Sequence, residues 1–303
     1  MDKSASVMPK GMIRRRGAGM TRISNRLIAV WMLLVLLLPA AGYADDVKIH
    51  QSGKFSYILL DDGTAEIVDY AGSKKRLEIP SKLKGKEVTG IGRSAFYWNK
   101  SLETVILPGT LTHIGGEAFK NCDKLTGITI PDSVSSIDAN PFENCERFET
   151  ITVSPDHPYL VVTGGVLFSR DDRRLICYPN AFTAESYTVP DGTMSIGDHA
   201  FCCCRLLKEI VLPDSVSIIG EGAFSLCNSL AVLTLPDGVT AIGKEAFSFC
   251  FDLTEIRIPS GVTFIGEKAF HGCDQLTVLV EAGSYAEQYC RENDIRYSVA
   301  DGF

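Results

Sequence analysis

The sequence is poor in the residues and motifs that most enzymes use. It holds only five histidines, at positions 50, 113, 157, 199 and 271, and they are scattered along 303 residues. No G-x-S-x-G, H-E-x-x-H or phosphate-binding glycine loop occurs. We therefore predict a protein that is not an enzyme, with no catalytic residue, no metal site and no cofactor.

Positive charge is also scarce outside the first 44 residues. Those residues contain seven lysines and arginines and one acid, which leaves 23 basic and 36 acidic residues in the remainder. Proteins bind nucleic acids largely by neutralising phosphates with lysine and arginine. The acidic composition of residues 45–303 therefore excludes nucleic acid as an expected partner.

Long apolar runs are limited to one, from Leu27 to Leu38. A basic segment precedes this run, and the small residues Gly42 and Ala44 follow it, which is typical of a secretory signal peptide. We predict that residues 1–44 are this signal and that cleavage leaves no membrane span. The mature chain is then expected at the cell surface, in the periplasm or in the medium.

Two alternatives for this segment stay open. The stretch from Leu27 to Ala44 is borderline in length for crossing a bilayer, so it could act as an uncleaved anchor. A start at Met20 would give a basic segment of more usual length. No cysteine for lipid attachment follows the apolar run.

The sequence does contain a 23-residue repeat of the form P-x-x-V-x-x-I-G-x-x-A-F-x-x-C-x-x-L-x-x-I-x-I. Its phenylalanine occurs at positions 96, 119, 142, 201, 224, 247 and 270, with 36 extra residues between the third and fourth copies. A fixed period of this length indicates a solenoid, in which each coil buries its apolar side against its neighbours.

Each repeat contains the pattern of a short strand followed by a short helix. Ile256 and Ile258 alternate as in a half-buried strand, and Pro259 ends that strand. The apolar residues of segment 265–273 have the spacing of one or two helical turns, with Gly266 at the turn before them. We therefore expect coils that each consist of a strand plus a short helix.

This repeat resembles that of the BspA-like leucine-rich repeat family of bacterial surface proteins, over about residues 62–297. The segments Asp62–Gly92 and Gly164–Pro179 also resemble that family's N-terminal unit and its interrupting hairpin. The resemblance implies a leucine-rich-repeat solenoid of the α+β repeat class, curved and right-handed, with a cap at each end. It also implies adhesion or binding to host or cell proteins.

The chain is expected to divide into six units. Ser284 and Glu287 have capping-box spacing and predict a short helix near the C-terminus. Two apolar runs, 161–169 and 174–178, flank Asp171 and Asp172 and predict a hairpin that interrupts the array. The predicted units are a signal peptide (1–44), an N-terminal capping unit (45–79), repeats (80–153), an interrupting β-hairpin unit (154–189), repeats (190–280) and a C-terminal cap (281–303).

Ten cysteines in a chain predicted to be exported suggest disulfides or metal ligands, but most of these cysteines occupy one position of the repeat. Six of the ten follow the repeat phenylalanine by three residues, which predicts small apolar core residues rather than disulfides or metal ligands. Cys204 belongs to this row. Aligned columns predict that Cys202 and His199 are exposed and that Cys203 is half-buried, so Cys202 is our candidate for a reactive thiol.

The outward residues of the predicted strands form the candidate protein-binding face. They are rich in threonine and valine and carry few charges, although β-branched residues suit strands whether or not they bind anything. We expect stacking to make them one extended patch. The candidate residues are Thr104, Ile106, Thr129, Thr152, Glu209, Val211, Thr234, Glu255, Arg257 and Val280.

Two functions fit these expectations. The first is a non-catalytic, exported solenoid that binds a protein ligand, either a host extracellular protein or a bacterial surface protein, in adhesion. The second is a periplasmic or envelope scaffold that takes part in regulatory interactions.

Overall fold

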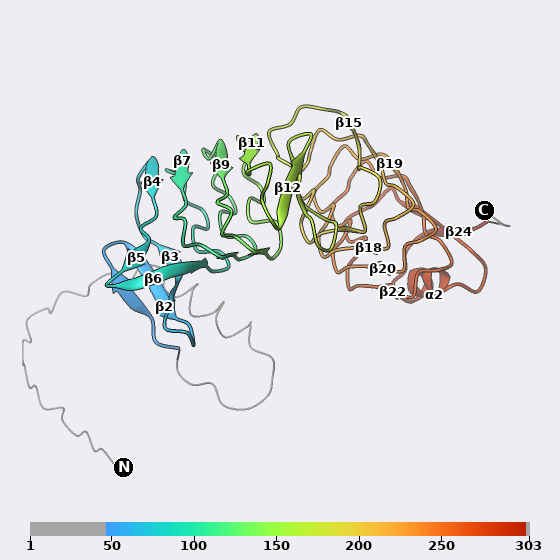
Figure 1. Cartoon of the computed structure of the whole chain (residues 1–303). Coiled ribbons are helices and arrows are strands. Elements are labelled where there is room, and N and C mark those ends of the chain that lie inside the picture. The colour runs from blue at the N-terminus through green and yellow to red at the C-terminus, as the bar shows by residue number, and fades with distance from the viewer. Residues whose placement is uncertain (1–46, 301–303) are drawn as a thin grey trace, which may run out of the picture. The chain divides into compact units, whose positions relative to one another are not determined.

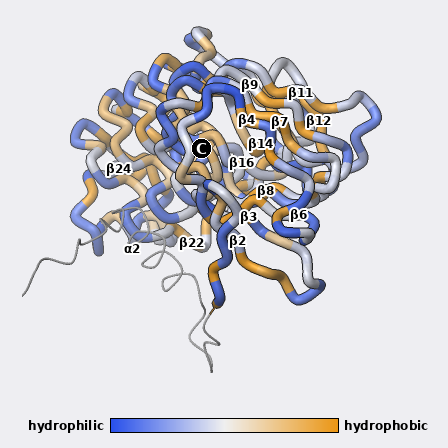
Figure 2. Tube along the Cα trace, turned by 90° about the vertical axis from the view of Figure 1, so that its left-hand side faces the viewer, coloured by the Kyte–Doolittle hydropathy of each residue, from blue (hydrophilic) through white to orange (hydrophobic). Residues whose placement is uncertain are grey.

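The computed structural model describes residues 47–300, which all belong to one compact unit. The predicted signal peptide lies outside the described residues. Figure 1 shows the chain winding through stacked coils, with an antiparallel meander at the start and a helix near the end. Hydrophobic and hydrophilic residues alternate along the coils (Figure 2), as a repeat with one buried side requires.

One side of the coils carries two parallel sheets, which we call the front sheets. The first consists of β4 (Arg76–Glu78), β7 (Thr104–Ile106), β9 (Gly127–Thr129) and β11 (Thr150–Thr152). The second consists of β15 (Ser186–Thr188), β17 (Glu209–Val211), β19 (Val232–Thr234), β21 (Glu255–Arg257), β23 (Thr277–Val280) and β24 (Tyr297–Val299).

Another side carries two sheets of mostly shorter strands, which we call the side sheets. The first has β1 (His50–Ser52), β2 (Phe55–Leu59), β3 (Ala65–Tyr70), β6 (Lys86–Ile91), β8 (His113–Ile114) and β10 (Ser136–Ile137), with β5 (Lys82–Leu83) paired to β6. The second has β12 (Leu160–Thr163), β13 (Val166–Ser169), β14 (Arg174–Cys177), β16 (Ser195–Ile196), β18 (Ile218–Ile219), β20 (Ala241–Ile242) and β22 (Phe264–Ile265).

The third side of each coil is a series of turns, so the prediction of a short helix in every coil is wrong. Every second backbone N–H group in these turns donates a hydrogen bond to the next coil. The N–H of His199 donates to the carbonyl of Glu221, and that of Phe201 to the carbonyl of Ala223, both at 2.8 Å. The N–H groups between them, such as those of Ala200 and Cys202, donate to the carbonyl three residues earlier in the same coil. His199 and Cys203 have φ of +58° and +63°, which a right-handed helix does not allow.

Close approach between coils explains the glycine before these turns. A Cβ on Gly266 would lie 2.3 Å from the backbone nitrogen of Lys244 in the preceding coil. The sequence suggested that Gly266 is needed for an unusual φ at a turn. The structure shows instead that this glycine is needed for close contact between coils. Asp138 occupies this position in the coil before the inserted hairpin.

The core is built from stacked identical residues. Phe201, Phe224, Phe247 and Phe270 lie nearly parallel, with successive ring centroids 5.2 to 5.5 Å apart. The cysteine of the repeat lies beside them: the Cys227 thiol donates to the carbonyl of Phe201 at 3.1 Å, and the Cys250 thiol to that of Phe224 at the same distance. The predicted core position of this row is confirmed for five of its six members, whereas Cys273 is half-buried. The buried members are Cys122, Cys145, Cys204, Cys227 and Cys250.

The insertion forms a wall between two hydrophobic cores. Strands β12, β13 and β14 make an antiparallel meander, with a second tight turn at Gly164 and Gly165 that the sequence did not predict. Leu167, Ile176 and Cys177 pack into the N-terminal core, whereas Val166, Phe168, Leu175 and Tyr178 pack into the C-terminal core.

The short helix predicted near the C-terminus is present as α2 (Tyr285–Glu292). Its N-cap Ser284 accepts a hydrogen bond from the backbone of Glu287, and the Glu287 side chain accepts one from the Gly283 N–H at 2.7 Å. The Tyr289 hydroxyl donates to the carbonyl of Gly266 at 3.0 Å and so ties this helix to the last coil. The boundaries of the six units stay predictions.

Candidate functional site

The outward residues of the front sheets are accessible, as the alternation in the sequence predicted. Of the ten candidate residues, eight are exposed. Val211 is 47% exposed and Ile106 is 38% exposed, so the front sheets offer aliphatic surface to a partner. The exposed members are Thr104, Ile106, Thr129, Thr152, Glu209, Val211, Thr234 and Glu255.

Val280 is a correction, because it is fully buried. The strand β23 pairs with β21 at a step of 22 residues, so Ile256 lies opposite Val278 and Arg257 opposite Leu279. The 23-residue period predicts that Val280 faces outward. A shift of one residue turns every side chain of a strand to the other face. The outward residues of β23 are therefore Thr277 and Leu279, both half-buried.

Arg257 is half-buried rather than exposed. Its guanidinium lies 2.9 Å from a carboxylate oxygen of Asp237, which is itself largely exposed. Its positive charge is therefore paired with the carboxylate of Asp237 at this point of the face.

The sequence predicts one continuous patch, but the front sheets form two separate patches. Strand β11 ends the first sheet and β15 begins the second, and no ladder joins them. The meander β12–β13–β14 occupies the chain between them (Figure 1). The candidate face is therefore two separate surfaces, one on each sheet.

The second front sheet carries a shallow groove of about 690 Å³. Its floor and walls come from the neighbouring strands β17 and β19 and the loops that follow them. Val211 and Val232 contribute exposed apolar surface, and Glu209, Lys208 and Asp214 add charge at its edge. Aliphatic surface surrounded by charged residues is typical of a protein-binding site.

The side sheets also expose apolar residues, which the sequence analysis missed. Ile218 is 48% exposed and Phe264 is 54% exposed. Each lies directly before the buried isoleucine of its strand, β18 or β22. Because neighbouring residues of a strand face opposite sides, the sequence could have predicted that these two residues are exposed. This surface offers a comparison for any test of the front sheets.

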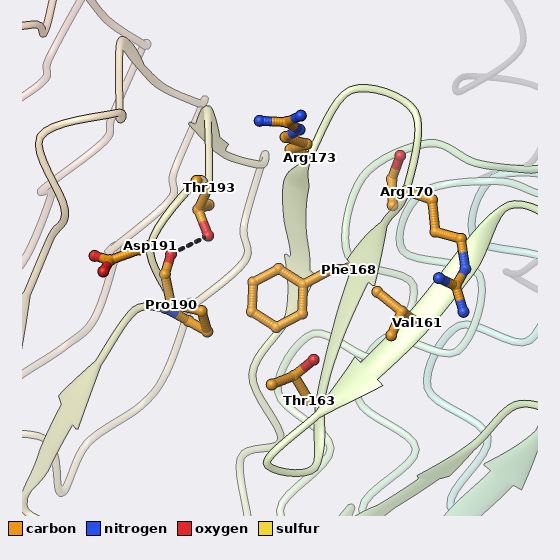
Figure 3. A pocket seen from close by; sticks show the side chains of 10 residues that line it. Val161, Thr163, Phe168, Arg170, Arg173, Pro190, Asp191 and Thr193 are labelled. Atoms are coloured by element: carbon orange, nitrogen blue, oxygen red, sulfur yellow. Dashed lines mark hydrogen bonds between the residues drawn. The ribbon is translucent and has the colours of Figure 1, made fainter. Parts of the chain in front are cut away.

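A smaller hollow of about 340 Å³ lies where the meander meets the coil that follows it. Figure 3 shows Phe168 and Val161 of the meander facing the segment Pro190–Thr193 across it. Arg170 and Arg173 stand on the meander side, and Asp191 stands opposite. The Thr193 hydroxyl is occupied, since it donates to the Pro190 carbonyl at 2.7 Å.

Cys202 is buried, which corrects the exposure predicted from its column. It is 2% exposed and Cys203 is 6% exposed, while the His199 side chain is 18% exposed rather than free on the surface. The cause is Glu143, which stands in the preceding coil although it lies 59 residues earlier in the sequence. The inserted residues do not come between the turns of the two neighbouring coils, so the turns before and after the insertion stack directly on one another.

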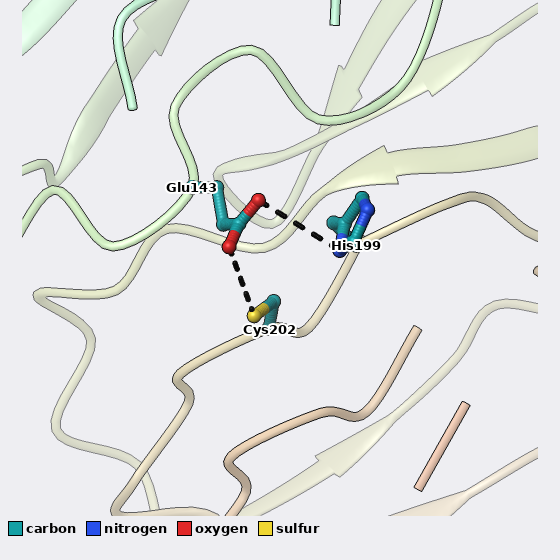
Figure 4. Close-up of side chains that lie close together, drawn as sticks. All are labelled: Glu143, His199 and Cys202. Carbon is teal, nitrogen blue, oxygen red and sulfur yellow. Dashed lines mark hydrogen bonds and ion pairs between the residues drawn. The ribbon is translucent and has the colours of Figure 1, made fainter. Parts of the chain in front are cut away.

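These residues form a cluster of a carboxylate, an imidazole and a thiol (Figure 4). The Cys202 thiol lies 3.4 Å from Oε1 of Glu143, and Nδ1 of His199 lies 3.7 Å from Oε2. The Lys120 ammonium is 2.9 Å from Oε1 of Glu143. Burial alone would lower the pKa of Lys120, but Glu143 and Glu117 outweigh it and raise that pKa.

The two neighbouring thiols differ in acidity. Their sulfurs are 3.7 Å apart. The hydrogen bond with Cys203, together with burial and the Glu143 carboxylate, raises the pKa of Cys202 well above its usual value. The same hydrogen bond lowers the pKa of Cys203. Chemical reactivity of Cys202, which stays a prediction, therefore lacks the exposure that had favoured it, and the raised pKa disfavours the thiolate.

None of the described residues forms a helix long and apolar enough to cross a membrane. The charged and nucleophilic groups of residues 47–300 do not combine into a nucleophile with a base and an oxyanion site at the front sheets, where threonine, valine and isolated charges prevail.

Comparisons with solved structures agree with the fold. A leucine rich cell surface protein from Faecalibacterium prausnitzii A2-165 aligns with a TM-score of 0.50 and 23% identity, over 86% of this chain and 100% of that chain. A leucine-rich repeat protein from Eubacterium ventriosum aligns with a TM-score of 0.51 and 21% identity, over 76% of this chain and 77% of that chain. At these identities the likeness shows the fold alone. No curated protein matches the sequence.

The family is shown by the repeat itself. The model of the BspA type leucine rich repeat region matches six copies, over residues 66–161 and 176–287, which is more than half of the chain. The break between these ranges falls within the meander β12–β13–β14. The chain therefore belongs to the BspA-type leucine-rich repeat family.

Proposed function

We propose that this chain is a non-catalytic, exported solenoid that binds a protein through its front sheets. The observation that carries the proposal is the pair of exposed valines beside the groove, Val211 and Val232, which are 47% and 52% exposed. Leaving such side chains in water forgoes stabilisation that burial against a partner would supply. The expected ligand is a host extracellular protein or a bacterial surface protein.

Two further features support this proposal. Leucine-rich repeat solenoids present their stacked strands as extended binding surfaces. The similar structure from Faecalibacterium prausnitzii is described as a cell surface protein, which favours export of this chain as well. The predicted signal in residues 1–44 has the same implication.

The test begins with capture of a partner. The purified protein is immobilised and offered host extracellular-matrix proteins and bacterial surface proteins, and the bound protein is identified. The double variant Val211→Lys with Thr234→Lys should then bind at least about tenfold more weakly, because it places two charged side chains in the lining of the groove and removes the apolar surface of Val211. Ile218→Lys, which changes an equally exposed aliphatic residue on a side sheet, is the matched control and should bind normally.

Loss of binding in Ile218→Lys but not in the double variant would contradict the front-sheet assignment. Location separates adhesion from the envelope-scaffold alternative. Cleavage of the protein by added protease on intact cells would favour adhesion, whereas protection until the outer envelope is opened would favour a periplasmic scaffold.

A further inference from the structure

The cluster of Glu143, His199 and Cys202 has the geometry of an ion-binding site. Its three ligand atoms, one from each residue, all lie within 4.8 Å of one another. Figure 4 shows Glu143 facing His199 and Cys202, with one carboxylate oxygen toward each of them. Bonds of about 2.0 to 2.3 Å to one tetrahedral ion place two ligand atoms about 3.3 to 3.8 Å apart. The 3.7 Å between Oε2 of Glu143 and Nδ1 of His199 lies in this range.

Two of these atoms lack a hydrogen-bond partner although they are buried. Oε2 of Glu143 and Nδ1 of His199 are inaccessible and have no hydrogen-bond partner. They lie 3.7 Å apart, which is within ion-pair distance when the imidazole is protonated but too long for a hydrogen bond. The Glu143 side chain is 6% exposed. Buried polar atoms in proteins normally have partners, so these two point to a group that completes the site.

The set of donors selects the kind of ion. A thiolate, an imidazole and a carboxylate suit Zn²⁺ and similar thiophilic cations, whereas Ca²⁺ and Mg²⁺ take sets made of oxygen ligands. His199 and Cys202 are three residues apart within one turn segment, a spacing that lets both reach one ion.

The surrounding charges are compatible with a divalent cation. Lys120 lies against Oε1 of Glu143, at 2.9 Å, and also against Oε2 of Glu117 at 3.3 Å. This leaves Oε2 of Glu143 directed toward His199. Arg93 in turn pairs with Glu117. A thiolate at Cys202 adds the second negative charge that the ion needs.

Space for the imidazole comes from the next coil. A Cβ on Gly222 would lie 2.5 Å from Nδ1 of His199, so this glycine keeps the ring where it is. The equivalent repeat position holds a side chain in every other coil: Ser94, Glu117, Asn140, His199, Glu245 and Lys268. Glycine thus occurs in this column at the one copy that follows the histidine.

We propose that Glu143, His199 and Cys202 bind one Zn²⁺ ion, which joins the coil before the meander to the coil after it. On binding, the Cys202 S–H bond breaks, its sulfur donates an electron pair to the ion, and the proton passes to solvent. Oε2 of Glu143 and Nδ1 of His199 donate the other two pairs. The ion thereby ties together two arrays, since Glu143 and Cys202 are 59 residues apart in the sequence.

The proposal is tested on the reduced, metal-stripped protein with Co²⁺ and Zn²⁺. Addition of Co²⁺ should produce a thiolate-to-cobalt absorption band that saturates at one ion per chain, and Zn²⁺ should displace it. Cys202→Ser should abolish the band and weaken Zn²⁺ binding more than about 100-fold, because it removes a direct ligand. Cys273→Ser, which removes a less buried thiol of another coil, should change neither.

His199→Gln provides a second variant in case Cys202→Ser does not fold. It should weaken Zn²⁺ binding at least about tenfold while circular dichroism and thermal unfolding confirm a folded chain. The proposal is overturned if no stoichiometric thiolate band forms, if either ligand variant binds Zn²⁺ as tightly as the parent, or if Cys273→Ser removes binding equally.

Discussion

The side-chain amide of Asn140 donates a hydrogen bond to the backbone carbonyl of His199 at 3.0 Å, across 59 residues of sequence. The backbone N–H of Asn140 also donates to the carbonyl of Asp198, at 3.0 Å. The turn side of the solenoid is therefore continuous past the insertion, although the front sheets are interrupted there. The meander leaves and re-enters the array without breaking the stack of turns.

This contact predicts a large cost for removing Asn140. The side chain is buried, and its oxygen also accepts a hydrogen bond from the Phe142 N–H at 2.9 Å. Asn140→Ala should lower the free energy of unfolding by about 1–3 kcal/mol, because buried polar groups lose their partners. Urea unfolding checks this, with Thr129→Ala as an exposed control expected to change it by no more than about 0.5 kcal/mol. Equal effects of the two variants would contradict a structural role for Asn140.

The phenylalanine stack should carry much of the stability of the C-terminal array. Phe224 is fully buried between Phe201 and Phe247. Phe224→Ala should therefore cost about 3–5 kcal/mol in urea unfolding, from lost burial and the cavity left behind. Phe264→Ala removes the same side chain from a 54% exposed position and should cost far less. A small effect at Phe224 would show that the stack can collapse around the gap.

The vicinal thiols should react in a definite order in the metal-free protein. Cys203 has the lowered pKa and Cys202 the raised one, so the thiolate forms first on Cys203. A thiol reagent at neutral pH, followed by peptide mapping, should label Cys203 before Cys202. Cys204 and Cys227, whose pKa values are raised by burial, should react only after unfolding. Early labelling of Cys202 would instead restore it as the reactive thiol.

Stability should depend on pH through His113 and Asp138, whose side chains are 3.5 Å apart. Hydrogen bonding to Asp138 raises the pKa of His113, and the same bond lowers the pKa of Asp138. A raised histidine pKa stabilises the fold below about pH 6.5, and this contribution is lost as pH rises through the folded-state value. The carboxylate's contribution is present above about pH 4 and is lost as pH falls through its lowered value.

The expected result is therefore a larger cost of His113→Gln at about pH 5.5 than at about pH 9. Urea unfolding at the two pH values measures the difference. In the Asp138→Asn background the difference should shrink, because the partner carboxylate is gone, although Glu66 also lies close enough to affect His113. A cost that is the same at both pH values would exclude coupling between this histidine and its carboxylates.

Much of the repeat architecture follows from the sequence because the spacing is regular. The stacked phenylalanines, the buried cysteine row and the outward threonines of β7, β9 and β11 all follow from a period of 23 residues. The capping box at Ser284 was equally visible, since its two side chains satisfy backbone groups locally.

Local deviations from the 23-residue repeat could not be predicted from the sequence, for physical reasons. The apolar spacing of segment 265–273 is shared by a helix and by a series of turns. In earlier coils, N–H groups of the equivalent turns donate to the next coil, and only this stacking distinguishes the turns from a helix. A single missing residue before β23 turned Val280 inward. The burial of Cys202 depends on Glu143, which becomes its neighbour only because the insertion leaves the turn side unbroken.

The central claim, binding through the front sheets, is tested most directly by photo-cross-linking to the captured partner. A photoreactive amino acid is placed at Val211 or Val232 on the second front sheet, or at Ile218 or Phe264 on the side sheet, all exposed positions. Cross-links to the partner are expected from Val211 and Val232 and not from Ile218 and Phe264. Cross-links confined to Ile218 and Phe264 would contradict the claim and place the binding surface on the side sheet.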